Sequence, residues 1–450
     1  MIKKILIANR GEIAVRIIRA CRELGIHCVA VYSTADRSAL HAQIADEAVC
    51  IGPASVSESY LNMKAIISAC MITGCDAVHP GFGFLSENAE FAALCRENNI
   101  KFIGPSPESI AMLGDKARAK ETMKNSGVPV IPGSDGAVKT LDEAKKAAAE
   151  IGYPVLVKAS AGGGGRGIRM VVSESELEKE LTIAQQEAKN FFGDDAVYIE
   201  KFISRPRHIE VQIMADEFGN TVYLGERDCS MQRRNQKVLE ETPSPVMTGE
   251  LRRKMGEAAV KAAKACNYFN AGTIEFLVDE NKNFYFMEMN TRIQVEHPIT
   301  EFVTGIDLVK TQIKVASGEK LDFSQNDIKI SGHSIECRIN AENPHLNFRP
   351  SPGTIDALHI PGGPGIRVDS AVYQGYTIPP YYDSMIAKLI VYAPTRAEAI
   401  MKMKWALAEF IVDGVDTNID FQLELIKNPD FEKGDYDNGF LNELIKQGRI

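Results

Sequence analysis

Two apolar segments just past the middle of the chain show the clearest strand pattern. Residues 273–278 and 284–289 are rich in β-branched and aromatic side chains, and the polar residues 280–283 separate them. This pattern is typical of two antiparallel strands joined by a short polar turn. The sequence therefore predicts a β-hairpin here.

The expected pairing of this hairpin brings two carboxylates together. If Asp279 pairs with Phe284, then Glu275 lies opposite Glu288 on one face, where like charges repel each other. A bound Mg²⁺ would offset the repulsion, because it takes carboxylate oxygens and leaves positions open for phosphate. Asn290 shares this face and can add an amide oxygen. The alternative is a hairpin with a charged face that is merely solvated.

The first part of the chain alternates strands with helices. Apolar strands are expected at residues 3–8 and 28–32, with a helix at 13–24 between them, which predicts a doubly wound α/β domain. Only Gly11 lies in the first turn, so a dinucleotide-binding fingerprint is absent. The glycine-rich segment 79–87 lies either at the ligand edge of the parallel sheet or in a plain tight turn.

A second glycine-rich segment, residues 161–167, lies between expected strands at 153–159 and 168–172. It is not a P-loop, because no Lys-Ser/Thr pair follows its last glycine. Its backbone N–H groups can still close over polyphosphate, and Lys158 would place a cation beside the same phosphates. We therefore favour phosphate binding over the alternative, a flexible surface linker.

Shorter patterns predict the remaining elements. Further strands are expected at residues 47–51, 77–79, 101–103, 196–202, 208–216, 220–225 and 331–340, and short ones within 347–381. Helices are expected at residues 116–126, 140–150, 249–266, 301–317, 395–412 and 419–426.

Charged residues accompany the later elements. One interpretation of the polar segment 226–244 is a solvated loop. Arg292 and Glu296 follow the hairpin directly. Arg338 lies between apolar residues of an expected strand, and a part-buried arginine usually has an anionic partner.

The string Met401-Lys402-Met403 matches the short sequence around a biotinylated lysine. A biotin acceptor would lie at the tip of a tight β-hairpin, whereas Ile400, Met403, Leu407 and Phe410 fall on one helical stripe. We therefore predict a helix here and not a biotin attachment site.

Composition narrows the classes of function. The chain has 450 residues, which suggests two to four domains, and its net charge of −9 argues against nucleic acid as the main partner. We expect no signal peptide, because the apolar run near the N-terminus is short. We expect no membrane helix either, because no run approaches ~20 apolar residues.

The nine cysteines are scattered and form no C-x₂-C pair. This spacing favours reduced thiols in a cytoplasmic protein, packed as small apolar residues. Neither a zinc site nor a disulfide framework is expected.

Taken together, a series of motifs resembles the biotin carboxylase family within the ATP-grasp fold, over essentially the whole chain. They occur in the family's order: IANRGEIAVRI, HPGFGFLSEN, GDK, GGGGRG, HIEVQ, ERDCS, EMN, QVEHP and ECRINAE. Each motif alone is weak, but the combination is highly specific. The chain looks like a stand-alone subunit of the bacterial acetyl-CoA carboxylase type, without a carrier or carboxyltransferase domain.

The resemblance implies a multi-domain protein of α/β and α+β class. Residues 1–114 would form the N-terminal doubly wound α/β domain. Residues 115–330 would form the ATP-grasp domain, with a mobile lid at about 131–203, and residues 331–450 a C-terminal mixed α/β domain.

The resemblance also implies the roles of individual residues. Residues expected to bind ATP are Lys116, Lys158, Gly164, Gly165, Glu200, Lys201, Ile203, His208, Gln232, Asn235, Glu275 and Glu288. Glu275, Glu288 and Asn290 would ligate the metal. Lys237, Arg292, Gln294 and the Val295 backbone would hold bicarbonate, Glu296 would be its base, and Arg338 would face the biotin ureido oxygen. Phe82 and Asn235 stand where tyrosine and histidine are frequent in the family, which puts local nucleotide contacts in doubt.

The implied reaction carboxylates biotin on a carrier protein, using bicarbonate and ATP with Mg²⁺ or Mn²⁺, through carboxyphosphate. Implied partners are a biotin carboxyl carrier protein and carboxyltransferase subunits, and a homodimer is expected. Three alternatives stay open. They are another ATP-grasp ligase that acts on an amine, a non-catalytic nucleotide-binding protein, and the same enzyme in a pyruvate or acyl-CoA carboxylase.

Overall fold

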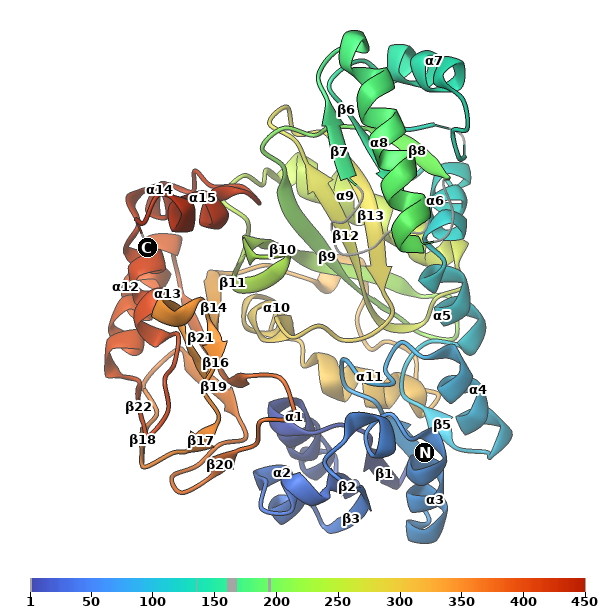
Figure 1. Ribbon diagram of the computed structural model, residues 1–450. Coiled ribbons are helices and arrows are strands. Elements are labelled where there is room, and N and C mark those ends of the chain that lie inside the picture. The colour runs from blue at the N-terminus through green and yellow to red at the C-terminus, as the bar shows by residue number, and fades with distance from the viewer. Residues whose placement is uncertain (1, 135, 160–167, 193–195, 450) are drawn as a thin grey trace. The chain divides into compact units, whose positions relative to one another are not determined.

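The computed structural model describes residues 2–134, 136–159, 168–192 and 196–449. These form two compact units, which are described separately (Figure 1). The first unit comprises Met1–Val128, Arg207–Leu277 and Glu288–Ile450. The second comprises Pro129–Pro206 and Val278–Met287. The predicted domain boundaries stay predictions.

A parallel sheet begins the first unit. Its strands run in the order β3-β2-β1-β4-β5. Ile5 and Ile7 pack into one apolar cluster with helices α1 and α11, whereas Leu6 packs into another with α3 and α4. Helices therefore cover both faces, which confirms the predicted doubly wound domain. The elements are β1 (Lys4–Ile7), α1 (Gly11–Glu23), β2 (His27–Ser33), α2 (Leu40–Ile44), β3 (Glu47–Gly52), α3 (Met63–Thr73), β4 (Ala77–His79), α4 (Ala89–Glu97), β5 (Lys101–Phe102) and α5 (Pro107–Gly114).

A second, eight-stranded sheet carries most of the predicted site residues. Its order is β13-β12-β9-β10-β11-β14-β21-β19. The strands β14, β21 and β19 thus continue the sheet of β9 to β13, with Leu239 paired to Cys337 across β11 and β14. The strands are β9 (Arg207–Ala215), β10 (Thr221–Arg233), β11 (Gln236–Thr242), β12 (Asn270–Val278), β13 (Phe284–Asn290), β14 (His333–Asn340), β19 (Ile366–Ser370) and β21 (Met385–Ala393).

Helices and short strands complete the first unit. The helices are α6 (Lys116–Asn125), α9 (Gly249–Ala265), α10 (His297–Thr304), α11 (Leu308–Ala316), α12 (Arg396–Glu409), α13 (Ile419–Lys427), α14 (Pro429–Lys433) and α15 (Phe440–Lys446). The short strands are β15 (Glu342–Asn343), β16 (Arg349–Pro350), β17 (Gly353–Thr354), β18 (Ala357–His359), β20 (Thr377–Ile378) and β22 (Ile411–Asp413). Lys402 lies within α12, which confirms that its motif is helical. Among the described residues, no helix has the length and apolar character needed to cross a membrane.

Two local expectations are corrected. The helix expected at 301–317 is two helices, because Gly305 adopts φ +73° at the end of α10 and Asp307 caps α11. The segment 226–244 is not a solvated loop, since most of it forms β10 and β11 with largely buried residues. Arg234 and Asn235 form its two-residue turn with φ of 51° and 65°, the geometry of a type I′ hairpin.

The turn of the β12–β13 hairpin also differs from the prediction. The Asp279 amide donates to the Asn283 carbonyl at 2.9 Å, and Lys282 donates to the Asp279 carbonyl at 3.0 Å. Lys282 has φ +67°, which closes a three-residue loop. Asp279 therefore pairs with Asn283 and not with Phe284, so the predicted opposition of Glu275 and Glu288 does not follow from the turn.

The second unit has its own small sheet and core. Its strands, in the order β7-β6-β8, are antiparallel. Val155, Val157 and Ile199 pack in its core against helix residues such as Leu177 and Ala144. The elements are α7 (Leu141–Ile151), β6 (Val155–Ala159), β7 (Ile168–Val171), α8 (Glu174–Phe192) and β8 (Val197–Lys201). The glycine segment 161–167 lies outside the described residues.

Candidate active site

Lys237 lies at the centre of a buried charged cluster in the first unit. It follows the tight Arg234–Asn235 turn at the start of β11, and its side chain is 12% exposed. The carboxylates around it raise its pKa well above the ordinary value although burial lowers it, so the ammonium group is charged at neutral pH. Its Nζ contacts Glu210 at 2.6 Å, Glu296 at 2.7 Å, Glu275 at 2.9 Å and Gln294 Oε1 at 3.2 Å.

Glu296 is fully buried at the N-terminal end of α10. Its Oε1 accepts from Lys237 at 2.7 Å, and its Oε2 accepts from Arg338 at 3.0 Å. Burial raises the pKa of this carboxyl, but Lys237, Arg338 and Arg227 outweigh it and hold the pKa well below its usual range. Glu296 is therefore an ionised carboxylate at neutral pH.

Arg338 confirms the prediction of an anionic partner. Its Nε donates to Glu240 at 2.7 Å, and one terminal nitrogen donates to Glu296 at 3.0 Å. Burial raises the pKa of Glu240 to about 7, although Arg338 lowers it in part. The guanidinium group is thus held between two buried carboxylates and points toward the proposed base.

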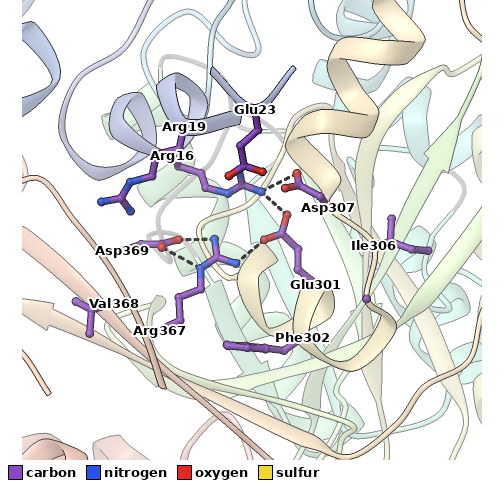
Figure 2. Close-up of a pocket in the computed structure, with 11 residues that line it drawn as sticks. Arg16, Arg19, Glu23, Glu301, Phe302, Ile306, Asp307, Arg367, Val368 and Asp369 are labelled. Atoms are coloured by element: carbon purple, nitrogen blue, oxygen red, sulfur yellow. Dashed lines mark hydrogen bonds and ion pairs between the residues drawn. The ribbon is translucent and has the colours of Figure 1, made fainter. Parts of the chain in front are cut away.

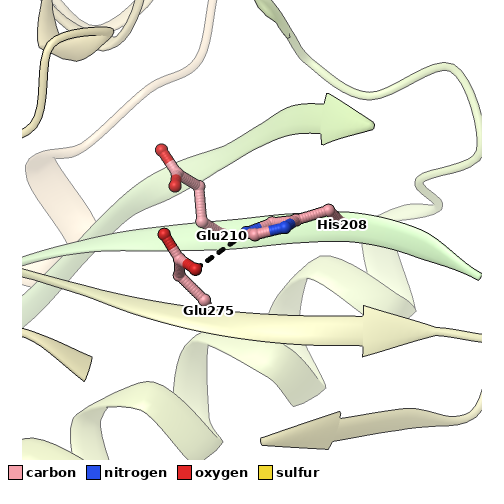
Figure 3. A group of neighbouring side chains, drawn as sticks. All are labelled: His208, Glu210 and Glu275. Atoms are coloured by element: carbon pink, nitrogen blue, oxygen red, sulfur yellow. Dashed lines mark ion pairs between the residues drawn. The ribbon is translucent and has the colours of Figure 1, made fainter. Parts of the chain in front are cut away.

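His208, Glu210 and Glu275 form a group of neighbouring side chains (Figure 3), and two of them, Glu210 and Glu275, also contact Lys237. His208 Nε2 lies 3.0 Å from Glu275 Oε2, and its Nδ1 lies 2.9 Å from Gln232 Nε2. Ligand atoms of His208, Glu210 and Glu275 lie within 4.8 Å of one another. Burial raises the pKa of Glu275, but Lys237 and His208 hold it well below its ordinary value.

The structure brings two of the three predicted metal ligands, Glu275 and Asn290, together. Asn290 Nδ2 donates to Glu275 Oε1 at 2.9 Å, which places these two side chains together. Glu288 lies two residues before Asn290 on β13, its side chain is 42% exposed, and Lys116 Nζ lies 3.4 Å from it. Two carboxylates and an amide oxygen are the ligand types that Mg²⁺ prefers.

Arg292 and Gln294 are oriented by two carboxylates. Arg292 Nε donates to Glu87 at 2.9 Å, and Glu87 also accepts from the Thr291 amide at 3.0 Å. Gln294 Nε2 donates to Glu275 at 3.0 Å. The glycine-rich segment 79–87 therefore fixes the side chain of Arg292 through Glu87, so it is more than a plain turn.

The other predicted ATP-binding residues lie in the second unit. Lys158 Nζ donates to Glu200 Oε2 at 2.6 Å, and Lys201 Nζ donates to the Gly152 carbonyl at 2.8 Å. Ile203 is half-buried. Gly164 and Gly165 lie outside the described residues.

Sequence reasoning missed several residues that hold the cluster together. Arg227 is fully buried and bonds Glu210, Gln212 at 2.8 Å and Thr300 at 2.9 Å. Glu210 and Glu240 provide carboxylates for Lys237 and Arg338. A usable signal existed in HIEVQ, where Glu210 and Gln212 alternate with apolar residues on a strand.

Comparison with known families gives consistent matches along the chain. Residues 1–110 match the biotin carboxylase N-terminal domain, and residues 336–443 match the biotin carboxylase C-terminal domain. Residues 115–324 match the ATP binding domain of the carbamoyl-phosphate synthase L chain. The fold and the site thus define an ATP-dependent ligase of the ATP-grasp type.

Individual relatives cover almost the full length. The chain is 60% identical to biotin carboxylase 1 of Bacillus subtilis (strain 168) over 449 residues, 100% of both chains. It is 56% identical to a pyruvate carboxylase subunit of Methanothermobacter thermautotrophicus, covering 98% of this chain and 90% of that one. A similar solved structure is the biotin carboxylase domain dimer of Hydrogenobacter thermophilus 2-oxoglutarate carboxylase with MgADP, ADP and bicarbonate. It has a TM-score of 0.90 at 53% identity, covering 99% of this chain and 98% of that chain.

The chain belongs to the biotin carboxylase family. It is an ATP-dependent ligase that carboxylates biotin, and the predictions of an ATP-grasp fold and of ATP with Mg²⁺ as cofactors are confirmed.

Proposed function

We propose that the buried cluster around Lys237 activates bicarbonate for attack on ATP, with Glu296 as the base. The observation that carries this proposal is the Glu296 carboxylate, which Lys237 and Arg338 hold at 2.7 and 3.0 Å in a fully buried position. Bicarbonate is a poor nucleophile, and a fixed carboxylate that takes its proton makes it a better one.

The neighbouring side chains suit the anion that this base requires. Arg292, Gln294, Lys237 and the Val295 backbone would hold bicarbonate. The two cations among them, Lys237 and Arg292, would also stabilise the charge that spreads over the phosphoryl oxygens during transfer. The product would be carboxyphosphate, which releases CO₂ and phosphate in a closed site.

Arg338 has the second role in this proposal. The departing phosphate would take the N1 proton of biotin, and negative charge would develop on the ureido oxygen. A guanidinium group can stabilise that oxygen by a charge-assisted hydrogen bond. Arg338 also binds Glu296. The same side chain would therefore hold the base that activates bicarbonate and stabilise the ureido oxygen when biotin is carboxylated.

The nucleotide and its metal would be held by the remaining predicted residues. Lys116, Lys158 and the glycines Gly164 and Gly165 would contact phosphates, while Glu200, Lys201 and Ile203 would hold adenine, with His208, Gln232 and Asn235 nearby. Glu275, Glu288 and Asn290 would hold Mg²⁺ or Mn²⁺, which neutralises phosphate charge when bound.

The carboxylase that this enzyme serves is a separate question. We propose acetyl-CoA carboxylase, with a biotin carboxyl carrier protein and carboxyltransferase subunits as partners, a homodimeric state and a cytoplasmic location. A pyruvate carboxylase is the second candidate, because the similar protein from Methanothermobacter is a pyruvate carboxylase subunit. Sedimentation showing a monomer at micromolar concentration would contradict the dimer.

The first experiment is ADP production with Mg²⁺ and bicarbonate, with and without free biotin. Marked stimulation by biotin that also requires bicarbonate is expected. Turnover of ATP that is indifferent to biotin, in folded protein, would contradict the proposal and favour a ligase that acts on an amine.

A further inference from the structure

Lys388 is a fully buried lysine that the proposed reaction does not use. It lies on β21, and its side chain is 0% exposed. Its Nζ donates to the Val295 carbonyl at 2.8 Å and lies 3.1 Å from Glu12 and 3.7 Å from Asp369. A lysine is almost never buried without such partners, so its position calls for a physical reason.

The sheet register places Lys388 beside Arg338. The two residues pair directly across β14 and β21, and directly paired residues point to the same face of a sheet. Arg338 donates to the side chain of Glu296, whereas Lys388 donates to the carbonyl of Val295. Two neighbouring cations therefore hold two consecutive residues of the segment before α10.

A chain of ion pairs holds Lys388 itself. Arg367 pairs with Asp369 at 2.7 Å and with Glu301 at 2.6 Å, and Arg16 pairs with Glu301 at 2.8 Å, as Figure 2 shows. These residues line a pocket of about 360 Å³. Both ends of the chain lie on α1, because Glu12 and Arg16 are one helical turn apart. Its members are Glu12, Lys388, Asp369, Arg367, Glu301 and Arg16.

The chain of ion pairs reaches α10 at Glu301. Glu301 lies on α10, five residues after Glu296, so the helix is tied to α1 and β19 at one point and to Lys388 at its beginning. Burial lowers the pKa of Lys388, but Glu12, Glu336 and Asp369 outweigh it and raise the pKa above the ordinary value. The ammonium group therefore stays charged and keeps its hydrogen bond at working pH.

We propose that Lys388 is a positioning residue for carboxylation, because it fixes the peptide that joins Val295 to Glu296. This inference rests on the proposed function, in which the Val295 backbone holds bicarbonate and Glu296 takes its proton. The Val295 N–H lies in the peptide before this one, so both roles depend on the backbone on the two sides of Val295, whose carbonyl Lys388 holds. Small misplacements of reacting groups cost large factors in rate. Without the Nζ donor, the buried carbonyl would have to reorient to find another partner.

The test is Lys388→Met, which keeps most of the side-chain volume and removes the donor. We expect the KM for bicarbonate to rise at least about tenfold, with the Kd for ADP within about twofold of wild type. Lys402→Met is the matched control, because Lys402 also donates to two backbone carbonyls, those of Pro364 and Tyr392, both at 2.8 Å. It should leave the KM for bicarbonate unchanged.

Glu12→Gln is the second variant, because it weakens the hold on Lys388 without touching the segment. We expect it to raise the KM for bicarbonate about threefold, and this result decides the matter if Lys388→Met does not fold. An unchanged KM for bicarbonate in folded variants would overturn the inference, and so would an equal loss of ADP affinity. Wild-type protein without biotin-stimulated turnover would instead overturn the proposed function.

Discussion

Lys237 and Lys116 are both proposed to meet substrate charge, yet their surroundings differ. Lys237 is 12% exposed and has four acceptors within 3.2 Å, whereas Lys116 is 83% exposed and lies 3.4 Å from Glu288. Burying a charge is costly unless partners compensate, so the surroundings of Lys237, the buried end of the site, must supply all of its partners in the folded protein. Water solvates the surroundings of Lys116, the exposed end of the site. The nucleotide and the metal can order the charges there when they bind.

This contrast separates two kinds of electrostatic site. At the buried end, donors and carboxylates keep their positions without substrate, which is the preorganisation that catalysis requires. At the exposed end, screening weakens every charge pair. Substitutions at the buried end should therefore change both rate and stability, whereas those at the exposed end should change ligand affinity alone.

The largest effect is expected for Glu296→Ala. Loss of a general base typically costs ~10²–10⁴-fold in rate, so biotin-dependent ADP production should be nearly abolished while ADP binding stays within about threefold. The variant should also lose about 1.5–3 kcal/mol of stability, because Lys237 and Arg338 each lose one of their buried carboxylate partners. Glu296→Gln is the isosteric control. Turnover within about tenfold of wild type would show that Glu296 is not the base.

Glu240→Gln tests the buried end through pH. The pKa of Glu240 in the folded protein is about 7, above its ordinary value near 4.5. Between pH 4.5 and 7 the folded state therefore keeps a proton on Glu240 that the unfolded state has lost. The contribution of Glu240 to stability therefore falls as pH rises from about 4.5 to 7 and is constant above that. Glutamine mimics the protonated form, so the variant should gain about 1–3 kcal/mol relative to wild type between pH 5 and 8. Thermal unfolding at several pH values measures this, and a pH-independent difference would contradict it.

Sequence reasoning located the two ends of the site with unequal success. Arg338 was expected to have an anionic partner because a charge between apolar residues must be compensated, and the structure gives it Glu240 and Glu296. The predicted opposition of Glu275 and Glu288 assumed that Asp279 pairs with Phe284. In the structure Lys282 adopts a left-handed conformation, the loop is one residue shorter, and Asp279 pairs with Asn283. Strand patterns are local, whereas hairpin register depends on turn geometry that a single sequence specifies weakly.

The long-range partners were beyond local reasoning. Glu87 and Lys388 are distant in sequence from the groups that they hold, Arg292 and Val295. Only the tertiary packing of the first unit brings each of these pairs together. The resemblance supplied residue roles along the chain, but not the side chains that orient them.

At the exposed end, Glu288→Gln should weaken the requirement for metal without unfolding the protein. Removing one of two carboxylate ligands should raise the Mg²⁺ concentration for half-maximal turnover about tenfold, and saturating Mg²⁺ should restore much of the rate. The melting temperature should change by less than about 2 °C, because surface substitutions usually stay within ~0.5 kcal/mol. A melting temperature that falls as far as in Glu296→Ala would erase the contrast between the two ends.

The smallest effect is expected for Lys116→Met. Its ammonium group is 83% exposed, and exposed charge pairs are worth about 0.2–1 kcal/mol, so the KM for ATP should rise about two- to fivefold with kcat within about twofold. The change should shrink further in added salt, because screening already weakens this contact. Lys237→Met provides the comparison at the buried end, where the same loss of charge leaves three carboxylates without their shared cation. Equal effects of the two substitutions on rate and melting temperature would show that burial does not decide how much each lysine contributes.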